Sequence, residues 1–186
     1  MARKHARILV SIWEDPDFIA LPSLHQVVYF AVLSSRDLSW CGVNPYLPQR
    51  FKAMSADMTE RRFTGAVEAL DDARFLVLDR DTAEVAARTF VRHDDILNVP
   101  NVSKAMGRAL QLVRSPRIRT SVISELARVH RERPDARGWA SFAAADPDLF
   151  SEVCGIPSLK GSRNPSANPS LKGSRNPSAN PSAKGS

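Results

Sequence analysis

The side chains best suited to chemistry in this sequence are arginines and small residues near the middle of the chain. Arg61, Arg62, Thr64 and Gly65 follow Thr59 within seven residues. Guanidinium groups bind phosphates and read base edges through paired hydrogen bonds. A glycine lets another backbone approach closely. This group of residues therefore predicts contact with nucleic acid.

A helix from about Thr59 to just before Phe75 must position these residues. Apolar residues recur there with helical spacing, at Phe63, Ala66, Val67, Leu70 and Ala73. At about 100° per residue they form one stripe, which predicts a helix with one buried face. Thr59 can cap this helix, because its hydroxyl accepts a hydrogen bond from a free N–H of the first turn.

The outer face of the predicted helix is basic at its start and acidic at its end. After Arg61, Thr64 and Gly65 it carries Glu68 and Asp72. Carboxylates repel phosphate, so a helix that enters a DNA groove would use its N-terminal half. The alternative interpretation is an amphipathic core helix with ordinary solvated charges.

The neighbouring elements predict a winged helix-turn-helix. A short helix at residues 49–54 precedes a turn and the longer helix, and two apolar runs at 75–78 and 85–91 follow it. The polar link at residues 79–84 predicts that these runs form a hairpin. A module with the order helix, turn, helix and hairpin binds DNA more often than it binds anything else.

Three further cations join the candidate DNA contacts because of this arrangement. Arg50 and Lys52 lie in the short helix, and Arg80 lies in the hairpin link. The link has one basic residue and three acidic ones, and a wing that binds phosphate usually has more basic residues.

The preceding residues supply the expected scaffold. Pro22 and Ser23 open a helix with Leu24, Val27, Val28, Ala31 and Val32 on its apolar face. Residues 41–44 can form a short strand that pairs with the hairpin, with Cys41 as a small buried side chain. We therefore expect a mainly α fold with a small β-hairpin.

No pattern in the sequence predicts an enzyme, a metal site or a cofactor. We find no P-loop, nucleophile elbow or Cys/His metal frame. His93 stands beside Asp94 and Asp95, but no second cluster of metal ligands accompanies it. The metal hypothesis for His93 is therefore the minor one.

Helices at residues 102–113 and 116–131 are expected after the hairpin. The second carries Arg117, Arg119, Arg128 and Arg131, which predict a second DNA surface, a docking helix or only a solvated face. Residues 134–155 either fold back as a short helix or form a docking peptide. The predicted division is a winged helix-turn-helix at 1–95, a helical extension at 96–155 and a tail at 156–186.

The tail explains most of the net charge. The 186-residue chain carries +6, but five of its 26 basic residues and none of its 20 acidic residues lie from Pro157 onward. The tail is an imperfect 12-residue repeat rich in Pro, Ser, Gly and Asn, which predicts a disordered basic segment. It is either a loose, salt-sensitive phosphate contact or a passive tail.

Composition also bounds the setting. The sequence has no run of 18 apolar residues, so we expect no membrane span. The basic start MARKHARILVSIW lacks the features of a signal peptide. The two cysteines lack metal-type spacing and fit a reduced cytosol. We therefore expect a cytoplasmic protein, which would mean the host cytoplasm for a phage protein.

One family resemblance spans about residues 7–130. The chain reads SIWED with Phe18 three residues later, then GVNPY, a helix-turn-helix, FVRHD and NVPN. It resembles the N-terminal domain of phage replisome organisers, relatives of the DnaD-type primosome proteins. The resemblance implies a replication initiator that binds origin DNA and helps recruit or load the replicative helicase. It also implies DNA contacts by Arg61, Arg62, Thr64, Gly65 and Arg80.

The partners implied are double-stranded DNA and the helicase or its loader, and self-association is left open. Two other classes remain beside the initiator. One is a winged-helix transcription regulator of phage or bacterial origin, because fold does not fix function. The other is a protein-interaction adaptor, which the nearly neutral remainder of the chain allows, since 21 basic residues there face 20 acidic ones.

A chain that ends at Gly155 should keep its fold and sequence preference but bind DNA with a weaker salt dependence. The tail's five cations motivate this expectation. For every phosphate that the shortened chain no longer binds, the log–log salt slope should fall by about 0.9. Titrations at several salt concentrations measure the slope, and equal slopes for both chains would show that the tail does not touch DNA.

Overall fold

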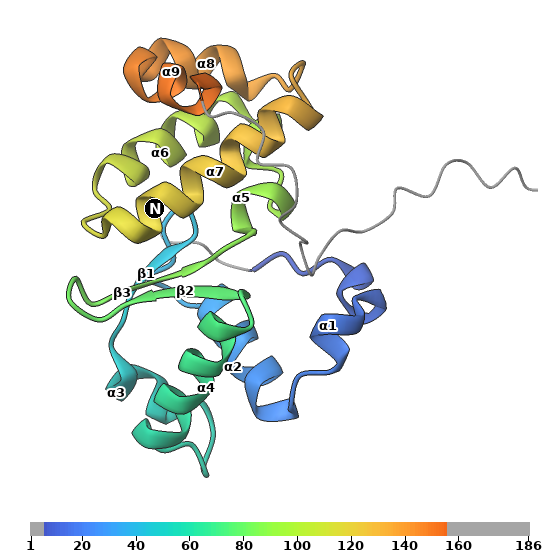
Figure 1. Cartoon of the computed structure of the whole chain (residues 1–186), viewed down its shortest axis with the longest axis vertical. Coiled ribbons are helices and arrows are strands. Elements are labelled where there is room, and N and C mark those ends of the chain that lie inside the picture. The colour runs from blue at the N-terminus through green and yellow to red at the C-terminus, as the bar shows by residue number, and fades with distance from the viewer. Residues whose placement is uncertain (1–5, 156–186) are drawn as a thin grey trace, which may run out of the picture.

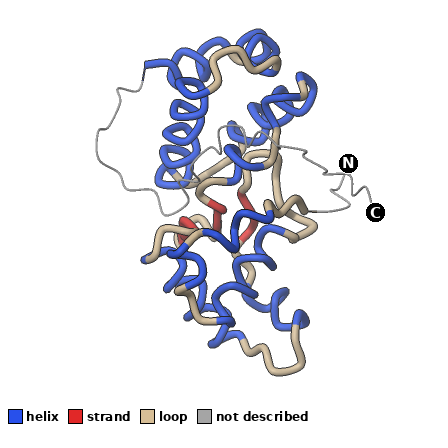
Figure 2. The backbone as a smooth tube through the Cα atoms, turned by 90° about the vertical axis from the view of Figure 1, so that its right-hand side faces the viewer, coloured by secondary structure: helices blue, strands red, loops and turns tan. Residues whose placement is uncertain are grey.

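The computed structural model describes residues 6–155. The expectations for the basic residues 1–5 and for the repeat tail at 156–186 lie outside the described residues. Figure 1 shows a small sheet in the middle of the protein, with α2, α3 and α4 on one side and α6 to α9 on the other. Figure 2 shows the same layering from the side, with the strands between two groups of helices.

The half below the sheet in Figure 1 is built from the first part of the chain. Its elements are η1 (Val10–Glu14), α1 (Pro16–Ile19), α2 (Ser23–Leu33), α3 (Pro48–Phe51), η2 (Lys52–Met54) and α4 (Glu60–Asp72). The expected helix order is therefore present, and Lys52 lies in the 3₁₀ turn that directly continues α3.

The sheet has three antiparallel strands in the order β1-β3-β2. They are β1 (Val43–Pro45), β2 (Leu76–Asp79) and β3 (Glu84–Ala87). In the register, Ala86 of β3 faces both Val43 and Val77. The expected pairing of a short early strand with the hairpin is confirmed, and Cys41 just before that strand is fully buried.

The lower core forms between α2, α4 and the sheet. Phe63, Val67 and Leu70 of α4 are fully buried, as are Val28 and Val32 of α2. The expected apolar face of α2 was wrong at one position, because Val27 is 48% exposed and Tyr29 is buried instead. Tyr29 packs edge-on against Phe18 and Phe75, so an aromatic cluster turns this side of α2 toward the core.

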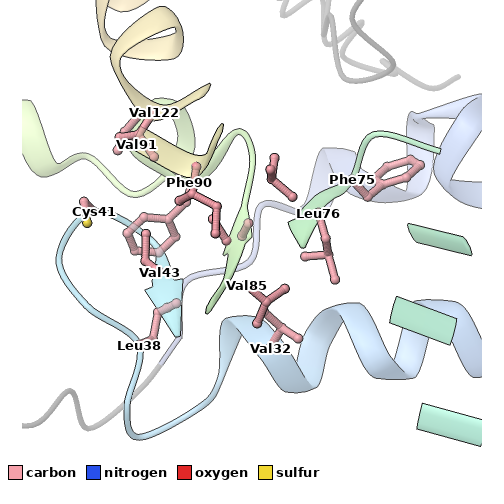
Figure 3. Close-up of a cluster of buried hydrophobic side chains, with 14 of the residues drawn as sticks. Val32, Leu38, Cys41, Val43, Phe75, Leu76, Val85, Phe90, Val91 and Val122 are labelled. Atoms are coloured by element: carbon pink, nitrogen blue, oxygen red, sulfur yellow. The ribbon is translucent and has the colours of Figure 1, made fainter. Parts of the chain in front are cut away.

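The second apolar run was expected to be a strand as far as Val91, which was wrong. β3 ends at Ala87, and α5 (Phe90–His93) follows. Phe90 and Val91 are consecutive and both buried. Successive strand residues point to opposite faces, so a strand would leave one of them unpacked on this side of the sheet. Figure 3 shows Phe90 beside Val43 and Cys41, and Val91 beside Val122 of α7.

The turn before β1 fits this packing. Gly42 has φ +82°, and a Cβ there would lie 2.6 Å from the Cβ of Phe90. Only glycine adopts this backbone conformation easily and also leaves room for the ring. The Cys41-Gly42 turn and α5 therefore pack directly on one another.

The upper half consists of the remaining helices. They are η3 (Ile96–Asn98), α6 (Pro100–Gln111), α7 (Pro116–Glu132), α8 (Gly138–Ala145) and α9 (Pro147–Gly155). The two expected helices, α6 and α7, are present. The segment that follows them folds back as two helices rather than one, and buries Trp139, Phe142, Leu149 and Val153.

The hairpin is attached to the start of α7 by buried and part-buried hydrogen bonds. The carboxylate of Glu84 accepts from the backbone N–H of Ser115 at 2.7 Å and from that of Arg114 at 3.2 Å. The N-terminus of a helix favours such an anion, because its first N–H groups lack partners within the helix. Glu84 therefore joins the sheet to the upper helices.

Asp79 makes a second connection from the other strand of the hairpin. One of its oxygens accepts from the backbone of Asp81 and Thr82, which shapes the turn, and the other accepts from the Ser115 hydroxyl at 2.5 Å. The same hydroxyl caps α7 by accepting from the N–H of Ile118. The bonds from Ser115 and Thr82 lower the pKa of the Asp79 carboxyl.

A second set of contacts joins the end of the hairpin to the middle of α7, and α5 to the last residue of α7. Arg88 lies 3.4 Å from Glu125, and Arg92 lies 2.6 Å from Glu132. Burial raises the pKa of Glu125, while the charge of Arg88 opposes that rise. Both halves of the molecule are thus joined by polar contacts as well as by apolar packing.

Replacing Glu84 with glutamine should destabilise the fold by about 1–3 kcal/mol. The change keeps the shape but removes the charge, and it turns an amide N–H₂ toward N–H donors at the start of α7. Urea unfolding of the variant and of Asp72→Asn, an exposed acid on α4, measures the difference. An equal free energy of unfolding in both variants would contradict the proposed connection.

Candidate nucleic-acid interface

Helix α4 has the cap and the buried stripe that the sequence predicts. The Thr59 hydroxyl accepts from the N–H of Arg62 at 3.2 Å. Phe63, Ala66, Val67 and Leu70 are buried, while Ala73 is the half-buried C-cap residue. The cap determines the residue at which the helix begins. The buried stripe determines which of its residues face outward.

The outer face of α4 also matches the prediction. Arg61, Arg62 and Gly65 are exposed. Thr64 is half-buried, and its Oγ1 accepts a hydrogen bond from the Tyr46 hydroxyl at 3.3 Å. A Cβ added at Gly65 would meet no atom within 4 Å. Internal packing therefore does not require glycine at this position, and the surface above it is open to another molecule.

The location of α4 in the protein leaves this face accessible. In Figure 1, α3 and α4 form the end of the molecule opposite α8 and α9. The loop that leads into α4 lies at the tip of that end. Arg61 and Arg62 occupy the first turn after this loop, so no described element of the upper half covers them.

Most of the candidate cations already have carboxylate partners. Arg50 lies 2.5 Å from Asp37, Arg62 lies 2.5 Å from Asp57, and Arg80 contacts Glu68. Hydrogen bonds from Ser55 and Arg62 lower the pKa of Asp57. Thus three predicted DNA contacts are ion-paired within the protein.

Two candidate cations differ from these. Arg61 and Lys52 are exposed and form no ion pair with the residues at 6–155. Arg61 lies on the outer face of α4, whereas Lys52 lies in η2 beside α3. Among the predicted cationic contacts, these two side chains have no carboxylate partner in the described part of the chain.

The pair of Arg80 with Glu68 brings the hairpin to the outer face of α4. Glu68 follows Arg61, Thr64 and Gly65 along the same face of the helix. The fold therefore gathers Arg61, Arg62, Thr64 and Gly65 on one surface and places Arg80 at its edge. Arg50 and Lys52 lie on the neighbouring α3 and η2.

Sequence reasoning did not find the carboxylate partners or Tyr46. Asp37 lies in the loop after α2, and Asp57 lies in the loop before α4. Loop residues follow no periodicity, and Asp37 pairs with an arginine 13 positions away. The sequence predicts Glu68 only as a source of repulsion, because its pairing with Arg80 depends on where the hairpin folds.

His93 lies apart from this surface and is half-buried near several arginines. Burial, together with Arg92 and Arg133, lowers its pKa from 6.5 to about 4. Within the described residues, no three His, Cys, Asp or Glu side chains are grouped so that they could hold a metal ion. A neutral histidine among arginines is better explained as part of the contact between α5 and α7.

Comparison with protein-family models, with curated proteins and with solved structures found no match to this chain. In the part of the chain that the structure describes, no helix is long and apolar enough to cross a membrane. The interpretation of the surface on α4 therefore depends on its own residues and geometry.

Stability should fall as the pH drops from about 6.5 toward 4, in part because of His93. The unfolded chain binds a proton there near pH 6.5 and the folded protein only near pH 4, so unfolding takes up a proton between these values. The slope from this residue is at most about 1.4 kcal/mol per pH unit. Urea unfolding at several pH values should show that the free energy of unfolding of His93→Gln changes less with pH. An unchanged pH dependence would contradict the lowered pKa of His93.

Proposed function

We propose that the protein binds double-stranded DNA with a winged helix-turn-helix made of α3, α4 and the β2–β3 hairpin. In this proposal α4 enters the major groove by its N-terminal half, and the hairpin is the wing. The groove is wide enough for an α-helix, whose first residues then reach the base edges.

The observation that carries the proposal is the exposed first half of α4. Arg61 has no internal ion pair among the described residues, and the open surface at Gly65 allows a nucleic-acid backbone to come close. Glu68 and Asp72 lie farther along the helix and oppose deeper entry. The arrangement thus favours one direction of approach.

The further proposal is that this DNA binding serves replication initiation. It is supported by the resemblance of residues 7–130 to phage replisome organisers. In this interpretation the protein is not an enzyme and acts in the cytoplasm. It binds origin DNA through α4 and recruits the replicative helicase or its loader through another surface.

An interaction adaptor is the second candidate, and one observation favours it. Large apolar side chains are exposed near the N-terminus, at Ile8, Val10, Trp13, Ile19 and Val27. Contiguous apolar surface of this kind marks interaction sites in other proteins. Trp13 packs on Phe30, which lies one helical turn from Val27, so Trp13 lies against α2.

Binding assays separate these functions. An initiator should bind repeated sites and co-purify with helicase or its loader, whereas a transcription regulator should prefer one operator and switch a promoter. An adaptor should show no salt-dependent affinity for duplex DNA. The full-length chain is suitable for all three measurements.

Replacing Arg61 with alanine should weaken binding to the preferred duplex roughly fivefold or more. One bidentate base contact contributes ~1–3 kcal/mol, and 1.4 kcal/mol corresponds to a tenfold change. Fluorescence anisotropy with the preferred and a scrambled duplex measures the effect, which should be larger for the preferred one.

Arg108→Ala is the matched control, because Arg108 is an exposed arginine on α6 in the other half of the molecule. It should change affinity only slightly. If both variants bind the preferred duplex equally well, with circular dichroism showing intact folds, the assignment of α4 as the recognition helix is wrong.

A further inference from the structure

Each ion-paired cation of the proposed interface has its carboxylate partner on a different part of the fold. Asp37 lies in the loop after α2, Asp57 in the loop before α4, and Glu68 on α4 itself. The arginines are 45–62% exposed and their partners 46–70% exposed. The pairs are therefore outside the core, with Arg62 and Glu68 on α4 itself and Arg50 on the neighbouring α3.

We propose that Asp37, Asp57 and Glu68 act as internal substitutes for phosphate and limit the protein's affinity for DNA of unrelated sequence. The inference rests on the proposed DNA binding. A duplex must displace each carboxylate before Arg50, Arg62 or Arg80 can contact its backbone. Non-specific binding consists almost entirely of such backbone contacts, so it is weakened most.

The exposure of the pairs makes this exchange energetically accessible. Solvent-exposed ion pairs are weak, since water and salt screen them. By the measured range for such pairs, each one should weaken DNA binding by up to about fivefold. A phosphate can therefore replace a carboxylate when the rest of the interface holds the duplex in register.

The arginines of the proposed interface then have two different roles. Arg50, Arg62 and Arg80 become backbone contacts whose use depends on displacement of a carboxylate. Arg61 has no such competitor among the described residues and lies on the outward face beside Gly65, so it becomes the base-reading residue. Glu68 is then a specificity-determining residue although it does not attract DNA.

A double-mutant cycle on Glu68 and Arg80 separates displacement from simple repulsion. Dissociation constants for a duplex of unrelated sequence are measured at one salt concentration for the wild-type protein, Glu68→Gln, Arg80→Ala and the double variant. Glu68→Gln should tighten binding about threefold in the wild-type background. It should have a clearly smaller effect when Arg80 is absent, because no cation is then released.

Asp72→Asn is the matched control, made with and without Arg80→Ala. Asp72 is exposed on the same face of α4 and pairs with no cation within the described residues. Its effect should be the same in both backgrounds. The ratio of affinities for the preferred and the unrelated duplex should fall for Glu68→Gln and stay nearly constant for Asp72→Asn.

The outcomes distinguish this inference from the proposed function. If Glu68→Gln tightens binding equally with and without Arg80, the carboxylate acts only by repulsion, and the inference is wrong while DNA binding stands. If the full-length chain shows no salt-dependent affinity for any duplex, both the proposed function and this inference are wrong.

Discussion

The contact between the hairpin and the start of α7 is the interaction on which the arrangement of the molecule depends. Glu84 and Asp79 of the hairpin accept hydrogen bonds from Arg114 and Ser115, just where α7 needs partners for its first N–H groups. Arg117 extends the same contact, because its guanidinium donates to the carbonyl of Leu78 and to Asp71 at the end of α4. A single helix start thus holds the sheet, and through Asp71 also α4, against the upper half of the protein.

This attachment has a consequence for the surface on α4. Because Asp79 also shapes the hairpin turn, the position of Arg80 is tied to the position of α7. Arg80 then meets Glu68 at the edge of the outer face. The hairpin that we propose as a wing is therefore held between α4 and α7. A partner that binds the upper helices would then leave the orientation of the hairpin unchanged. Affinity and selectivity for DNA would depend on the local balance of charges rather than on movement of the wing.

Much of this fold could be predicted from local patterns, and the differences have physical causes. The stripe from Phe63 to Leu70 predicted α4 correctly, because a single buried face requires helical spacing. The helical turn at Phe90 was missed because a short apolar run fits a strand as well as a helix. The turn packs closely against Gly42, a contact that the sequence does not reveal. At the candidate site, the exposed residues of α4 followed from the same stripe. The ion pairs of Arg50 and Arg80 did not, since they depend on how loops and hairpin fold around the helix.

We propose that the protein binds duplex DNA in a sequence-dependent way through the exposed start of α4. The most direct test is selection of bound duplexes from a random library by the full-length wild-type protein at physiological salt, followed by sequencing. We expect enrichment of one short motif, the length of a major-groove contact by a single helix, with an affinity that falls as salt rises. Recovery of duplexes without any shared motif, together with an affinity independent of salt, would contradict sequence-dependent binding by α4.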